Sequence, residues 1–248
     1  MKVNLTKILP DLNAIMAYAD AVSVGAKSGC IIHIVKRDPQ WPIIYFANDM
    51  NSVYGSYVHS GPLEECDIAF RSNLFPDVSK GTMIMESTRD GVQFEWRKKG
   101  IRKTVTIPRE SEIQSIVEKA LERDYSVDNK VNITDSIFAA FEKEIGVSEL
   151  SVSSKNIKVK QFKPTGEESY ENTYDFRTTA KGWASMVSAG KVKKKSVTIN
   201  TSDFIKLVNL TGNEDFKMSI NGDSPLCISA QLNEGSIKLM LAHMVYRL

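Results

Sequence analysis

The side chains that could carry chemistry are few and scattered in this chain of 248 residues. Its three histidines and three cysteines lie far apart in the sequence: His33, His59, His243, Cys30, Cys66 and Cys227. No CxxC or HExxH spacing occurs, so a zinc site is not expected. An odd number of cysteines flanked by apolar residues predicts reduced, buried thiols and an intracellular protein. His33 stands in the apolar run CIIHIV and is interpreted as a core histidine.

Adjacent carboxylates occur at Glu64-Glu65 and Glu167-Glu168. Neighbouring residues on a strand point to opposite faces, so neither pair predicts general acid and base catalysis. The motifs GxSxG, GxxxxGK[ST] and GxGxxG are missing from the sequence. Because catalysis needs convergent titratable groups, we expect a protein that is not an enzyme and has no cofactor or metal.

Contact with phosphate is the other chemistry that the residues suggest. The chain has 32 Lys+Arg and 30 Asp+Glu, and a net charge of +2 does not indicate nucleic-acid binding by itself. Basic runs occur at Arg97–Lys99 with Arg102-Lys103, at Lys155–Lys163 and at Lys191–Lys195. A solubilising surface and a DNA-facing loop are both open interpretations of these runs. Trp96 adjoins the first run and could stack on bases, with core or edge packing as the alternative.

Two matches at nearly the same offset indicate an internal repeat. Val-Asn-Leu-Thr at 3–6 matches Val-Asn-Ile-Thr at 131–134, and DIAFRSNLF at 67–75 matches SVTINTSDF at 196–204 in pattern. The offsets are 128 and 129 residues. Helical apolar spacing follows the first match in both halves, over 7–21 and 135–145. We expect Thr6 and Thr134 to cap these helices.

The second match predicts a short strand that runs into a short helix in each half. The helices would be capped by Ser72 or Asn73 and by Thr201 or Ser202. A hairpin then follows, with turns at Arg89-Asp90-Gly91 and Asn221-Gly222-Asp223. Each half closes on one more strand, at 103–107 and 237–244. Strands are also predicted at 30–36, 43–47, 150–162 and 170–177.

This order of elements predicts an α+β fold with two tandem domains, each with two helices against antiparallel sheet. The predicted boundaries are residues 1–108 for the first domain, 109–127 for a connector with a helix at 111–123, and 128–248 for the second domain. The N-terminus has no apolar segment typical of a signal peptide, and no membrane association is expected.

Two such domains resemble the DNA sliding-clamp family, closest in size to the trimeric clamps. The region 196–244 carries the resemblance most clearly, with a strand, the helix start Thr201–Phe204, the hairpin at Asn221–Leu226 and a closing strand. The resemblance implies a homotrimeric ring that encircles double-stranded DNA without reading its sequence and tethers a DNA polymerase. A clamp loader would be a further partner. It also suggests a phage or other viral source, hence the cytoplasm of a bacterial host if the source is a phage.

The resemblance also implies two functional surfaces. In this family the helices line the pore, so basic residues near them become candidates for DNA contact: Lys7, Arg71, Lys80, Lys143 and Lys206. The first helix also offers Asp11 and Asp20 to the same outward surface. The pocket for a partner peptide would comprise Asn48, Val53, Ile113, Val117, Pro225, Met240, Ala242, Met244, Val245 and Tyr246. Plain core packing is the alternative for Met240 and Ala242.

Two other functions remain open from the sequence. One is a monomeric clamp-like processivity factor that binds DNA without closing a ring. The other is a non-enzymatic structural β-protein of a virion. The mass in solution distinguishes the ring from a monomer.

Overall fold

The computed structural model describes residues 2–23, 29–36, 43–48, 53–59, 64–78, 80–110, 117, 119, 130–133, 146–152, 156–162, 174–177, 184–186, 195–210, 216–220 and 225–242. The chain divides into two compact units. The first comprises Met1–Glu122 with Gln231–Ile237, and the second comprises Arg123–Ala230 with Lys238–Leu248. The domain boundaries at 108 and 128 stay a prediction.

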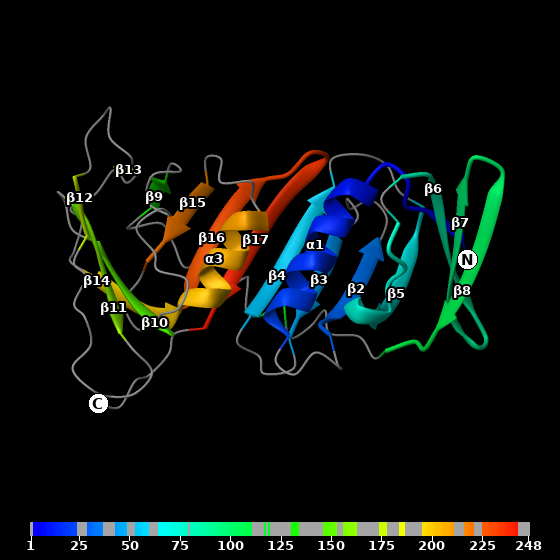
Figure 1. Cartoon of the computed structure of the whole chain (residues 1–248), viewed down its shortest axis with the longest axis horizontal. Helices are drawn as coiled ribbons and strands as arrows, with labels where there is room; N and C mark the ends of the chain where they lie inside the picture. The colour runs from blue at the N-terminus through cyan, green and yellow to red at the C-terminus, as the bar shows by residue number, and fades with distance from the viewer. Residues whose placement is uncertain are drawn as a thin grey trace. The chain divides into compact units, whose positions relative to one another are not determined.

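The first unit begins with β1 (Lys2–Asn4) and α1 (Leu9–Val22), shown in Figure 1. Four strands follow, β2 (Ile31–Lys36), β3 (Ile43–Ala47), β4 (Val53–His59) and β5 (Cys66–Arg71). A 3-10 turn, η1 (Ser72–Leu74), leads to β6 (Thr82–Thr88), β7 (Gly91–Lys98) and β8 (Ile101–Ile107). The order β4-β3-β2-β5 forms one layer, and β1-β6-β7-β8 forms a second sheet. Neighbouring strands are antiparallel wherever their register is described.

The core of the first unit lies where α1 covers the β4-β3-β2-β5 layer (Figure 1). The helix buries Leu12, Ile15 and Ala19 completely, and the ring of Tyr18 meets that of Phe46 edge to face at 6.1 Å. Pro10 lies in the first turn of α1, where its missing N–H costs no hydrogen bond. The helix ends at Val22 because Ser23 adopts an extended conformation.

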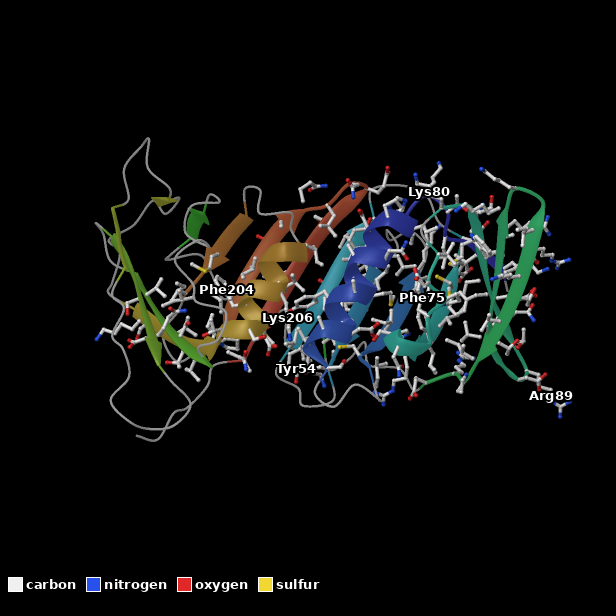
Figure 2. All side chains as sticks on the ribbon, viewed as in Figure 1. Tyr54, Phe75, Lys80, Arg89, Phe204 and Lys206 are labelled. Carbon is white, nitrogen blue, oxygen red and sulfur yellow. The ribbon has the colours of Figure 1, made fainter. Side chains whose placement is uncertain are left out.

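Three aromatic rings join the two sheets of this unit. Phe94 of β7 contacts Phe70 of β5 and Phe75 edge to face, with both centroid separations at 5.2 Å. Phe75 is labelled in Figure 2. Offset and edge-to-face pairs of this kind add to the stabilisation that burial provides.

The second unit contains β9 (Lys130–Ile133), β10 (Val147–Val152), β11 (Asn156–Phe162), β12 (Tyr174–Arg177), β13 (Ala184–Met186) and β14 (Lys195–Asn200). It continues with α3 (Thr201–Leu210), β15 (Phe216–Ser219), β16 (Leu226–Gln231) and β17 (Gly235–Leu241). One sheet has the order β12-β11-β10-β14, and a second layer has the order β13-β9-β15-β16-β17. The first three residues of β17, Gly235–Ile237, belong to the first unit.

The internal repeat is confirmed by strand order and by hydrogen bonding. The order β4-β3-β2-β5 corresponds to β12-β11-β10-β14, and β1-β6-β7-β8 corresponds to β9-β15-β16-β17. Ser72 donates its backbone N–H to Cys30 O at 2.8 Å, and Thr201 donates to Gly146 O at 3.2 Å. Both hydroxyl side chains are buried, at positions 129 residues apart. The α+β fold class with mostly antiparallel sheet is therefore confirmed.

Some local predictions are wrong. Thr6 does not cap α1, because its Oγ1 accepts the backbone N–H of Met83 at 3.1 Å and the helix starts three residues later. The cap of α3 is Asn200, whose Oδ1 accepts the N–H of Asp203 at 3.0 Å, rather than Thr201 or Ser202. Neither Ser72 nor Asn73 caps η1, since no side-chain cap bond is present there. Thr134 and the predicted helix at 135–145 lie outside the described residues.

The strand predictions are largely confirmed, but β1 and β9 were not predicted, and three further differences occur. The segment 150–162 forms two strands, β10 and β11, which pair with each other. Strand β4 was not predicted, because Gly55 and His59 interrupt its apolar alternation. Strand β13, which pairs with β9, was not predicted either. Within the described part of the chain, none of the helices combines the length and apolar character that crossing a membrane requires.

Candidate functional site

Asp11 is a buried charged side chain with several hydrogen bonds in the described part of the first unit. It lies in the first turn of α1 and is 0% exposed. Its Oδ2 accepts the hydroxyl of Tyr57 at 2.7 Å and the backbone N–H of Glu234 at 2.8 Å. Its Oδ1 accepts the backbone N–H of Asn233 at 3.1 Å and the side-chain amide of Asn233 at 2.9 Å. The prediction that Asp11 faces outward with Asp20 is therefore wrong for Asp11, because four donors hold it inside.

These four bonds fix the turn between β16 and β17 on the first unit. His59, at the end of β4, donates from Nδ1 to the carbonyl of Glu234 at 3.1 Å. A side chain at Gly235 would collide with the carbonyl of Val58 and the ring of Tyr57. Burial, followed by the hydrogen bond to Asp11, raises the pKa of Tyr57, so its phenol stays neutral and keeps donating. The turn is thus held by a carboxylate, an imidazole and close packing.

Sequence reasoning missed this cluster, although one signal was present. Asp11 stands three residues after Ile8 and four before Ile15, which is the spacing of the apolar stripe of α1. A carboxylate on such a stripe requires buried donors. The donors at Asn233 and Glu234 are 222 and 223 residues away and follow no local pattern.

The predicted DNA-contact residues fall into two groups. Lys7 and Lys80 are exposed, and Figure 2 labels Lys80. Arg71 is held by Glu110 Oε1 at 3.1 Å and by Gly29 O at 3.3 Å, while Lys206 Nζ lies 3.9 Å from Asp203 Oδ1. Lys143 lies outside the described residues. Lys7 and Lys80 therefore carry the charge that is more available to a ligand.

The exposed surface of α1 carries no positive charge. The helix LPDLNAIMAYADAV contains neither lysine nor arginine. Its exposed residues are Pro10, Ala17, Asp20 and Ala21. Asp20 accepts the hydroxyl of Ser72 at 2.6 Å. Any contact between a basic side chain of this unit and phosphate must therefore come from residues outside α1.

The described members of the predicted peptide pocket are mostly buried within their own units. In the first unit, the side-chain oxygen of Asn48 accepts the N–H of Val53 at 3.1 Å, and both residues are buried. Val117 is also buried there. In the second unit, Met240 is buried, whereas Pro225 and Ala242 are half-buried. Ile113, Met244, Val245 and Tyr246 lie outside the described residues.

Histidine and cysteine side chains outside these sets are buried in the described part of the chain. His33 is fully buried, as predicted, and its Nε2 lies 2.7 Å from Asp67 Oδ1. All three cysteines are free and buried, which confirms the predicted thiols. Burial raises the pKa of Cys66 and of Cys227 to about 11, so both remain protonated at neutral pH.

Comparison with known proteins identifies the fold through a solved structure. No family model matches the sequence, and no curated protein matches it either. A crystal structure of the Proliferating Cellular Nuclear Antigen from Entamoeba histolytica matches with a TM-score of 0.64 and 10% sequence identity. The match covers 95% of this chain and 96% of that chain.

The chain has the sliding-clamp fold. The likeness spans both units of the repeat, so the resemblance that began at residues 196–244 extends to almost the whole chain. At 10% identity it concerns the fold alone. The viral source stays a prediction.

Proposed function

We propose that this protein is a non-enzymatic DNA sliding clamp, in which three copies form a ring around duplex DNA and tether a DNA polymerase. The observation that carries the proposal is the clamp fold over 95% of the chain, together with its internal repeat. Two similar domains per chain give six similar domains in a trimer. A head-to-tail contact closes into a ring when the rotation between copies divides the circle.

The free strand edges support this assembly. Strand β17 lies next to β4 in the sheet order, and its first three residues belong to the first unit, as β4 does. By the repeat, β12 corresponds to β4 and β8 corresponds to β17. Both β12 and β8 are terminal strands of their sheets in the described part of the chain. Pairing of β8 with β12 of another copy would cover both edges.

Exposure of β8 is consistent with this contact. Six of its seven residues are exposed, including Ile101 at 57% and Val105 at 42%. Long exposed edges with apolar side chains are an aggregation hazard unless they are paired. A second copy would remove this hazard.

The proposed ring holds DNA through phosphate contacts that do not depend on base sequence. Lys7, Arg71, Lys80, Lys143 and Lys206 are the proposed contact residues, with Lys7 and Lys80 the most available. The polymerase and the clamp loader would each insert a short peptide, and a few apolar anchors would supply most of the binding energy. We propose the pocket wall at Pro225, Met240 and Ala242 with the C-terminal residues Met244–Tyr246, and at Asn48, Val53, Ile113 and Val117.

Mass measurement in solution tests the assembly. Sedimentation equilibrium at micromolar concentration is expected to give three times the chain mass of 27.7 kDa. The variant Val105→Glu should shift the equilibrium toward the monomer, because it replaces an exposed apolar side chain of β8 with a charged one. Thr106→Glu, on the opposite side of the same strand, is the matched control. A wild-type chain that stays at 27.7 kDa would reject the ring and favour a monomeric clamp-like factor.

A further inference from the structure

The two faces of the sheet β1-β6-β7-β8 carry charge in different ways. Because paired residues share a face of a sheet, the register places Arg97 beside Arg102 on one face. Trp96 lies beside Lys103, and Lys98 beside Ile101, on the other face. The basic run around residue 100 therefore splits into two separate sets of charges.

On the first face the charges are neutralised by carboxylates. Glu95 accepts hydrogen bonds from Arg97 and, at 2.7 Å, from Arg102. These bonds, that of Arg97 first, lower the pKa of Glu95, which therefore stays ionised. Lys2 lies 3.4 Å from Glu86 on the same face. This face offers little net charge to a ligand.

On the other face, lysines lie near Trp96, and among the described residues they have no carboxylate partner. The indole Nε1 donates to the backbone carbonyl of Lys80 at 3.1 Å, and Lys103 Nζ lies 5.7 Å from the centroid of the Trp96 ring. Among the described residues, no ion pair involves Lys80, Lys98 or Lys103. Lys80 and Lys103 are exposed, and Lys98 is half-buried.

Lys7 belongs to the same region. It follows Thr6, whose hydroxyl accepts the N–H of Met83 at 3.1 Å, and Met83 is the register partner of Trp96. Lys7 is exposed and has no ion pair among the described residues. We name Lys7, Lys80, Lys98 and Lys103 around Trp96 the lysine patch.

We propose that the lysine patch binds the phosphate backbone of duplex DNA, and that it takes the place of the surface of α1, which carries no positive charge. This inference rests on the proposed clamp function and names the DNA-contacting surface of the first unit. Ammonium groups bind phosphate as mobile point charges, which suits sequence-independent contact. The Trp96 N–H is bonded to the carbonyl of Lys80 and one ring face lies under Lys103, so Trp96 positions these two lysines.

The lysine patch is compatible with strand pairing at β8. Strand pairing uses the backbone groups at the edge of β8 and leaves side chains on the two faces. Lys103 reaches over Trp96 on one face and away from that edge. One strand can therefore contribute to both contacts.

Salt dependence of DNA binding tests the lysine patch. Anisotropy of a short linear duplex is measured over a range of salt concentrations with Lys80→Gln/Lys103→Gln. The matched control is Lys2→Gln/Arg89→Gln, which removes the same charge from the same sheet. Arg89 lies in the β6–β7 turn, at the opposite end of β6 from Lys80, as Figure 2 shows.

The slope of log K against log salt reports the number of phosphates neutralised, at about 0.9 for each. The patch variant should reduce the slope by about two and keep the mass of the wild type, whereas the control should leave the slope unchanged. Equal slopes in the two variants would contradict DNA binding by the lysine patch. The proposed ring and its clamp function would not be affected by that result. A patch variant with an altered oligomeric mass and a wild-type slope would also overturn it, because the lysines would then belong to the contact between copies. A wild-type protein that is not a trimer or does not bind duplex would reject the proposed function itself.

Discussion

The carboxylate of Asp11 accepts the backbone N–H of Glu234 at 2.8 Å, across 223 residues of sequence. With Asn233 bound to its other oxygen, Asp11 joins the first turn of α1 to the turn that opens β17. The turn before β17 is therefore anchored by a residue near the N-terminus. A buried carboxylate with four donors is stable only while those donors remain.

Replacement of Asp11 by alanine should leave the Tyr57 hydroxyl and the Asn233 and Glu234 amides without their acceptor. We expect the free energy of unfolding to fall by about 2–4 kcal/mol, less than the sum of the lost bonds because the turn can bind water. Urea denaturation measures the loss, and hydrogen exchange should show faster exchange at the Glu234 amide. Asp90→Asn, in an exposed turn, should change neither quantity. Unchanged exchange at Glu234 in Asp11→Ala would contradict the anchoring role.

Tyr57→Phe removes one donor from Asp11 and leaves the ring in place. We expect a loss of about 1–3 kcal/mol at neutral pH, typical of a hydrogen bond to a charged group. The pKa of Tyr57 is raised in the folded state, so its stabilisation is present below the ordinary tyrosine pKa of about 10 and is lost as pH rises above it. Urea midpoints should therefore converge between wild type and variant above about pH 10. An equal difference at all pH values would contradict this assignment.

How far the sequence predicts the structure is clear from particular residues. The repeat from Ile68 to Phe75 and from Val197 to Phe204 identified corresponding strands correctly, because alternation and helical spacing are local. The turn at Asp90-Gly91 was also predicted correctly, because an Asp-Gly pair is a local turn signal. Asp11 was assigned to the surface because its donors are distant in sequence. The separation of Arg97 and Arg102 from Lys98 and Lys103 depends on strand register, which composition does not contain.

Gly55 of β4 should not tolerate a larger side chain. A methyl group there would collide with the ring of Phe46, its register partner on β3. We expect Gly55→Ala to lower the free energy of unfolding by about 1–3 kcal/mol through overpacking, with partial recovery in Gly55→Ala/Phe46→Leu. Gly100→Ala is the control, because Gly100 has a φ of +79° in open space and should cost only about 1 kcal/mol of backbone strain. If Gly55→Ala were as stable as the wild type, the close approach of Gly55 to the Phe46 ring would be contradicted.

Cys66 and Cys227 should react slowly with thiol reagents in the folded protein. Their pKa values of about 11 leave about one thiolate in a thousand at pH 8. Labelling followed by mass spectrometry should show both sites protected at neutral pH, with full labelling after denaturation. Rapid labelling of either folded site at neutral pH would contradict the burial that raises these pKa values.

Retention on circular DNA tests the proposed ring most directly. The protein is loaded onto nicked circular duplex with its loader, isolated by gel filtration, and the fraction that remains bound is measured before and after one cut linearises the circle. A ring held by topology should stay on the circle and slide off the linear form. Equal retention on circular and linear DNA would contradict encirclement and with it the proposed clamp function.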